Sequence, residues 1–115
     1  MFRFQDLDVW KRPMVLTAQL MELADGLDKK RKYKIADQLR GSTLSITSNI
    51  AEGSGSFSRK EFRLFLNYAH RSAFEVANIL ILCEQQEWID RMTFGKCMDE
   101  LEEISRMIVG FSRSL

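Results

Sequence analysis

The sequence predicts an all-α protein, an up-down-up-down antiparallel four-helix bundle. Apolar residues recur every three or four positions along the whole 115-residue chain, and no stretch alternates as a half-buried strand does. The pattern divides into four segments of about 20 residues, and helices of that length extend about 30 Å and pack side by side. The connections hold only a few residues each, which favours antiparallel neighbours.

The first helix is expected from about Leu7 to Leu27. Its apolar residues form two adjacent rows, and a stripe that wide suits contact with more than one partner helix. The dipeptide Asp25-Gly26 and the basic run that begins at Lys29 mark its end.

The second helix is expected from Tyr33 to Glu52. The sequence Gly53-Ser54-Gly55 ends it, because glycine adopts the left-handed conformation at a helix C-terminus without steric cost. Ser58 and Glu61 then form a predicted capping box, in which each side chain accepts a hydrogen bond from the backbone amide of the other residue. The third helix follows this box and extends to about Gln85.

The fourth helix begins after Asp90, a favourable N-cap residue. Cys83 and Cys97 lie in apolar rows, where a free cysteine packs as a small hydrophobe. Trp10 and Trp88 are expected packing anchors. Six residues are expected to be buried, namely Leu39, Ile46, Ile50, Phe62, Phe65 and Leu101.

The composition indicates one globular domain that spans residues 1–115. Hydrophobic residues make up 45% of the chain, which excludes an intrinsically disordered protein. Two cysteines are too few for a disulfide framework. No apolar run reaches the roughly 18 residues of a membrane span, and the charged residues near Met1 disfavour a signal peptide. We therefore expect a cytoplasmic protein without membrane contact.

Basic and acidic residues separate along the chain, although the net charge is only +1. Residues 29–63 contain nine basic and three acidic residues, whereas residues 75–103 contain eight acidic and two basic ones. This asymmetry suits either an anion-binding region or solvated helix faces whose charges cancel after folding. The candidate nucleic-acid-binding residues are Lys29, Lys30, Arg31, Lys32, Lys34, Arg59, Lys60 and Arg63.

We expect no catalytic residue, no cofactor and no metal site, and therefore no enzyme. The only histidine, His70, lacks the Glu-x-x-His pattern of di-iron bundles, which favours an exposed or hydrogen-bonded structural histidine. The pairs Glu84/Glu87 and Asp99/Glu102 resemble the magnesium ligands of all-α nucleotide pyrophosphohydrolases. Acidic surface explains these carboxylates better, so a hydrolase is a remote alternative.

A polar seam follows the second helix at steps of four, three, four and three residues. Short hydroxyl and amide side chains disfavour helix, but they permit close approach of another backbone and offer it hydrogen bonds. The seam is therefore either a helix-packing or subunit-packing surface, or a plain exposed face. Its members are Gln38, Ser42, Ser45, Asn49 and Glu52.

Several motifs resemble a known family. They are Gln38-Leu39-Arg40, Asn49-Ile50-Ala51-Glu52-Gly53, Gly55, Ser58, Lys60-Glu61-Phe62 and the opening residues Phe4, Leu7, Val9 and Trp10. They resemble the small bacterial four-helix bundle proteins encoded by intervening sequences in 23S ribosomal RNA genes. Related bundles include the accessory protein of diversity-generating retroelements.

This resemblance covers nearly the whole chain and implies an up-down bundle that assembles as a ring-shaped homopentamer. For the retroelement relatives it also implies binding of nucleic acid and reverse transcriptase through a basic surface. The chain departs from the family at Ser56, where an arginine is common, and this change removes a cation from the loop. Arg71 adds a cation nearby.

Two functions follow from these patterns. The first is a non-catalytic homo-oligomer that presents repeated basic patches to RNA. The second is a protein-binding scaffold, for example for a reverse transcriptase, without nucleic-acid contact. In an up-down bundle the cations at 29–34 lie at the opposite end from those at 59–63, so we expect two separate basic sites on each protomer.

Overall fold

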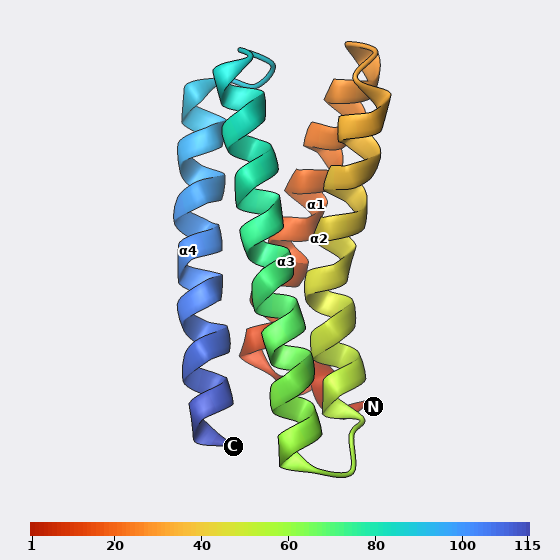
Figure 1. The fold of residues 1–115 in the computed structure, drawn as a ribbon, viewed down its shortest axis with the longest axis vertical. Coiled ribbons are helices and arrows are strands. Elements are labelled where there is room, and N and C mark those ends of the chain that lie inside the picture. Colours follow the sequence, from red (N-terminus) through yellow and green to blue (C-terminus); the bar gives the residue numbers. More distant parts are fainter.

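The computed structural model describes all residues from Met1 to Leu115 and confirms the all-α four-helix bundle (Figure 1). The helices run alternately up and down, and the molecule measures 44 × 21 × 21 Å. No helix is long and apolar enough to cross a membrane. The elements are the 3-10 helix η1 (Arg3–Asp6) and the α-helices α1 (Asp8–Lys29), α2 (Tyr33–Ser54), α3 (Arg59–Gln85) and α4 (Arg91–Ser114).

Both predicted N-caps are present. The Ser58 hydroxyl accepts a hydrogen bond from the Glu61 amide at 3.1 Å, although the reciprocal bond from Ser58 to the Glu61 carboxylate is absent. The Asp90 carboxylate accepts from the amide and the hydroxyl of Thr93, both at 2.8 Å. These two bonds favour the charged carboxylate and lower the pKa of Asp90 below its ordinary value.

The predicted role of Gly53 is wrong. This glycine lies inside α2 with a helical backbone, and no glycine in the chain has a positive φ angle. A Cβ atom on Gly53 would lie 2.6 Å from the Cβ of Phe65 and 2.9 Å from the Phe62 ring. Gly53 is therefore needed because α2 and α3 approach each other closely there.

The left-handed residues are instead Arg31, with φ 63°, and Glu87, with φ 60°. Each follows the end of a helix, α1 or α3. In both cases the amide of the next residue donates to the carbonyl four residues before the left-handed one, at 2.9 Å. This is the Schellman pattern of helix termination, formed here without glycine. The two helix ends are thus built alike.

The core contains 21 buried apolar residues drawn from all four helices. Of the six residues expected to be buried, five are, and Phe65 is half-buried beside α2. Cys83 and Cys97 are buried as expected, and burial raises the pKa of both thiols. Trp10 and Trp88 are half-buried and pack against this core.

The buried face of α2 is unusually polar. Ser42, Thr43, Thr47 and Ser54 are all buried in it. The Thr47 hydroxyl donates to the Leu44 carbonyl at 3.3 Å, whereas the buried Thr43 hydroxyl has no hydrogen-bond partner. A buried polar atom without a partner keeps its full desolvation cost, so Thr43 is a weak point of the core.

The unpartnered hydroxyl of Thr43 leads to a first prediction. Thr43→Val replaces that hydroxyl with a methyl group of similar shape, and we expect the free energy of unfolding to rise by about 1 kcal/mol. Thr47→Val is the control, because it removes a hydroxyl that has a partner and should not stabilise the protein. Urea denaturation measures both. Equal effects of the two substitutions would contradict the prediction.

The close approach of α2 and α3 at Gly53 leads to a second prediction. Gly53→Ala forces a shift of α3 and should lower the free energy of unfolding by about 1–3 kcal/mol. Gly41→Ala, in the same helix but with open space around its Cα, should raise it by about 1 kcal/mol, because alanine favours helix. The same chemical change is thus expected to have opposite signs at the two positions, as thermal and urea denaturation can measure.

Candidate nucleic-acid interface

The eight candidate cations lie in two groups at opposite ends of the bundle, as expected (Figure 1). The first basic turn, residues 29–34, joins α1 to α2 at the upper end of the figure. The second basic cluster, Arg59, Lys60 and Arg63, lies at the start of α3 at the lower end. The two groups therefore form separate sites on one protomer.

None of these eight cations forms an ion pair with a carboxylate. The arginines that do are Arg12, Arg40, Arg91 and Arg106. Seven of the eight candidates are exposed, and Lys32 is half-buried. The structure therefore divides the basic residues into a paired set and a set whose charges remain available to an external anion.

Arg40 belongs to the paired set, although it lies in the basic segment of the sequence. Its guanidinium donates to Asp28, to Asp25 at 2.7 Å and to Asp37 at 3.2 Å. The hydrogen bonds to Asp28 and Asp25 raise the pKa of Arg40 further above its ordinary value. Arg40 thus joins α2 to the end of α1, and its charge is neutralised inside the protomer.

The first basic turn lies next to the acidic turn between α3 and α4. The Lys32 ammonium sits 4.9 Å from the centre of the Trp88 ring, a cation–π contact that joins the two turns. Glu87 and Asp90 flank Trp88 in this turn. The basic and acidic segments of the sequence are therefore not separated in space at this end, where their charges partly cancel.

The second basic cluster is larger in the structure than in the sequence. Arg3 of η1 lies over the ring of Phe62, 5.2 Å from its centre. Arg63 donates to the backbone oxygen of Leu115 at 2.9 Å, which brings the end of α4 and its Arg113 to the same region. Sequence reasoning missed Arg3 and Arg113 because each is about 50 residues from the cluster, and only the fold unites them.

The polar seam lies largely within the protomer. Ser42 is buried, Ser45 and Asn49 are half-buried, and only Gln38 and Glu52 at its two ends are exposed. The Asn49 amide donates to the carbonyl and hydroxyl oxygens of Ser45, at 2.8 and 2.9 Å. A 2.9 Å bond between the Ser72 and Ser45 hydroxyls crosses from α3 to α2. The centre of the seam is thus a contact between these two helices.

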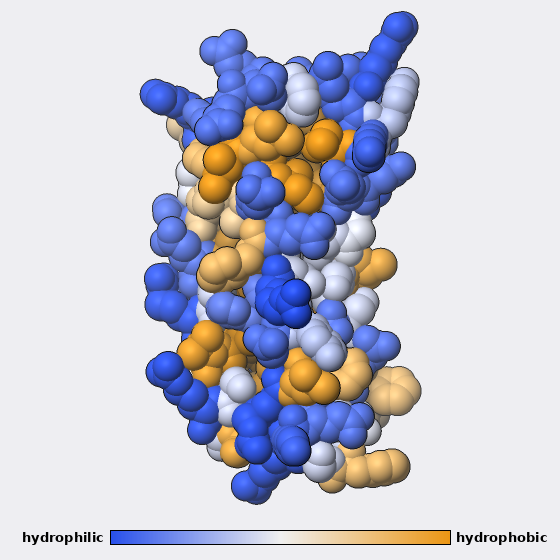
Figure 2. Space-filling view, in the orientation of Figure 1, coloured by the Kyte–Doolittle hydropathy of each residue, from blue (hydrophilic) through white to orange (hydrophobic).

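The outward surface of α3 carries two groups of exposed apolar side chains, with the exposed polar residues Arg71 and Asn78 between them. Figure 2 shows apolar side chains gathered over the upper half of α3 and beside α4, with polar side chains around them. Phe74, Ala77 and Ile81 share one side of the helix, and Phe74 and Ala77 border a cavity of about 330 Å³ against α4. The outer face of α3, as we call it, comprises the exposed side chains Leu64, Tyr68, Phe74, Ile81 and Leu82.

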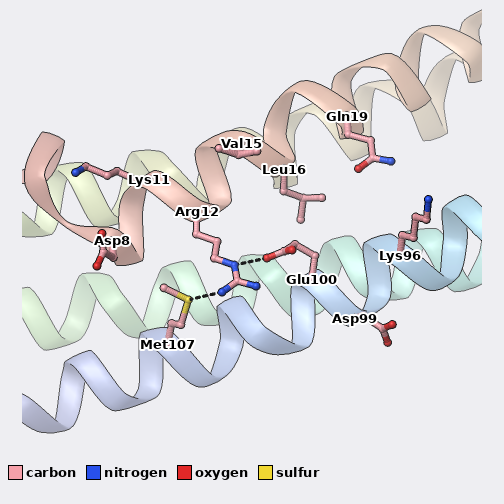
Figure 3. Close-up of a pocket in the computed structure, with 10 residues that line it drawn as sticks. All are labelled: Asp8, Lys11, Arg12, Val15, Leu16, Gln19, Lys96, Asp99, Glu100 and Met107. Carbon is pink, nitrogen blue, oxygen red and sulfur yellow. Dashed lines mark hydrogen bonds and ion pairs between the residues drawn. The ribbon is translucent and has the colours of Figure 1, made fainter.

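A wide groove of about 860 Å³ separates α1 from α4 (Figure 3). The Arg12 guanidinium crosses it to the Glu100 carboxylate and lies 4.0 Å from the Met107 sulfur. Charges of both signs line the groove, including Lys96 and Asp99. The groove therefore has no excess of one sign of charge that would favour a cationic or an anionic ligand.

The carboxylates do not gather into a metal site. No three His, Cys, Asp or Glu side chains converge, and Glu84 pairs with Arg91 at 3.6 Å. His70 is hydrogen-bonded, one of the two surroundings predicted for it, because its Nε2 atom shares a 2.8 Å hydrogen bond with the Ser105 hydroxyl on α4.

Comparison with known proteins agrees with this architecture. No curated protein matches the chain. A crystal structure of a protein of unknown function, from the S23 ribosomal protein family of Bacteroides thetaiotaomicron VPI-5482, is similar with a TM-score of 0.86. The two sequences are 25% identical, and the alignment covers 90% of this chain and 97% of that one. The 23S rRNA-intervening sequence protein family matches residues 5–110, and the chain belongs to this family.

Proposed function

We propose that the protein is a non-catalytic homo-oligomer that binds the phosphate backbone of RNA through the cations at the two ends of its bundle. The observation that carries this proposal is the pairing pattern. Of the 17 basic residues, four arginines pair with carboxylates within the protomer, and the other thirteen, which include all eight candidates, have no carboxylate partner. Unpaired surface cations that remain together after folding favour a polyanionic ligand.

Lysine and arginine contact phosphates without reading sequence, so we expect weak sequence selectivity. Each neutralised phosphate releases counterions, which makes the affinity strongly dependent on salt. Arg3 and Arg113 enlarge the site at the lower end, whereas the acidic turn opposes the first basic turn. In an oligomer each site is repeated, and the repeats bind one strand together.

Self-association uses the outer face of α3. Large apolar side chains that are exposed in groups are typical of a surface that another protein covers. Phe74 is 61% exposed and Leu64 is 46% exposed, and a second copy of the chain would remove both from water. The family resemblance implies five copies in a ring.

The same apolar face supports a second candidate function, a scaffold for another protein such as a reverse transcriptase. In that case the outer face of α3 binds the partner and the cations have no RNA ligand. The first function requires that the protein bind RNA and that this binding depend on the unpaired cations. The scaffold requires neither.

RNA binding is tested by neutralising each site. We expect the affinity for a single-stranded RNA to fall with salt, with a log–log slope of about −0.7 for each phosphate contacted. Changing Arg59, Lys60 and Arg63 together to Gln should flatten this slope, and so should changing Lys29, Lys30, Arg31 and Lys32. Arg106→Gln is the control, because Arg106 is already paired with Glu103 at 2.8 Å. Fluorescence anisotropy at several salt concentrations measures the slopes.

Affinity that is absent at low salt, or unchanged in both sets of variants, would favour the scaffold.

Self-association is tested by placing a charge on the outer face of α3. Sedimentation equilibrium of the wild-type protein should give a mass several times the 13.4 kDa of one chain. Phe74→Glu should reduce the mass toward one chain while circular dichroism stays helical, because the substituted side chain is exposed. Leu44→Glu, at a 55% exposed site on α2, is the control and should leave the mass unchanged. A single 13.4 kDa wild-type species would contradict the proposal.

A further inference from the structure

Phe57 is the most exposed large apolar side chain of the protein. Its relative exposure is 107%, so the ring makes almost no contact with the rest of the chain. It lies in the four-residue connection between α2 and α3, flanked by Ser56 and Ser58. Burial of this ring against a partner outside the protomer would remove apolar surface from water and would therefore be favourable.

Beside Phe57 is a small cavity with polar and cationic walls. Its volume is about 260 Å³, and Arg3 and Arg59 contribute to its lining together with Ser56 and Ser58. The hydroxyl of Ser56 is buried but has no hydrogen-bond partner, one of only two such side-chain atoms in the chain. The cavity therefore combines two positive charges with a hydroxyl that still lacks a partner.

The connection that carries Phe57 is well fixed. The amides of Gly55 and Ser56 donate back to the carbonyls of Glu52 and Gly53, at 3.1 and 3.0 Å. Ser58 caps α3, and the close contact at Gly53 fixes the end of α2 against the start of α3. A backbone that is already fixed loses little freedom on binding, which favours affinity.

The charge of the residues around Phe57 indicates which kind of partner its ring binds. The elements at this end carry six cations and four carboxylates, so the ring is surrounded by net positive charge. The cations are Arg3, Lys11, Arg59, Lys60, Arg63 and Arg113, and the carboxylates are Asp6, Asp8, Glu52 and Glu61. An apolar pocket on a second copy of the chain would gain nothing from these cations. An unpaired nucleotide supplies both a flat base and a phosphate.

We infer that Phe57, Arg3 and Arg59 form a binding site for one nucleotide step of single-stranded RNA. The base stacks on the Phe57 ring, and Arg3 and Arg59 contact the adjacent phosphate. The inference rests on the proposed RNA binding and adds a preference for unpaired strands. A duplex contacts the same cations, but its bases are already stacked on each other and offer no face to Phe57.

The test compares a labelled 12-mer of uridine with an RNA duplex of the same length. Phe57→Leu should weaken binding of the oligouridine about tenfold and leave duplex binding unchanged, whereas Phe57→Trp should retain both affinities. Stacking releases no counterions, so the salt dependence of Phe57→Leu should run parallel to that of the wild type. Arg59→Gln should instead reduce the slope by about 0.7. Leu44→Ala is the control, an exposed apolar side chain in the middle of α2 and away from both basic sites.

The outcomes separate this inference from the proposed function. If Phe57→Leu binds oligouridine as tightly as the wild type while the arginine variant binds more weakly, the stacking site is wrong and backbone binding stands. If the wild type binds neither RNA at low salt, both are wrong. If Phe57→Leu lowers the mass in sedimentation, the ring docks on a second copy of the chain, and the inference is overturned.

Discussion

The close approach of α2 and α3 is the constraint on which the rest of the structure depends. It requires that Gly53 have no side chain, and it is lined with short residues such as Ser45 and Ser72, whose hydroxyls bond across it. These two helices contact each other most extensively, whereas α1 and α4 contact each other least among the neighbouring α-helices. The close packing of α2 against α3 fixes the connection between them. The sparse packing of α1 against α4 leaves the wide groove that Arg12 crosses to reach Glu100.

Each end of the bundle draws its chemistry from parts of the chain that are distant in sequence. At one end, Lys32 meets Trp88, and a basic turn becomes a surface of mixed charge. At the other, η1, the start of α3 and the end of α4 converge, and their arginines add to one another. Helix direction alone decides which segments meet, so the up-down topology determines where the net positive charge lies.

The helices, their caps and most of the core could be predicted from the sequence because they depend on local spacing. The left-handed residues after α1 and α3, Arg31 and Glu87, could not be predicted. Glycine is the residue expected in that conformation at a helix end, and neither residue is glycine. The neutralisation of Arg40 depends on carboxylates of another helix. The exposure of Phe57 could not be predicted either. Phe57 lies in a connection between two helices, where no helical periodicity indicates whether a side chain faces the core or water.

The two tryptophans stand at opposite ends of the molecule in different surroundings. Trp10 packs against the ring of Phe4, 5.0 Å away, near the start of α1, whereas Trp88 lies beneath the ammonium of Lys32. Indole emission responds to a nearby charge and to ring contacts. The protein therefore carries an intrinsic optical probe at each end, and single Trp→Phe variants would allow events at one end to be followed without a label.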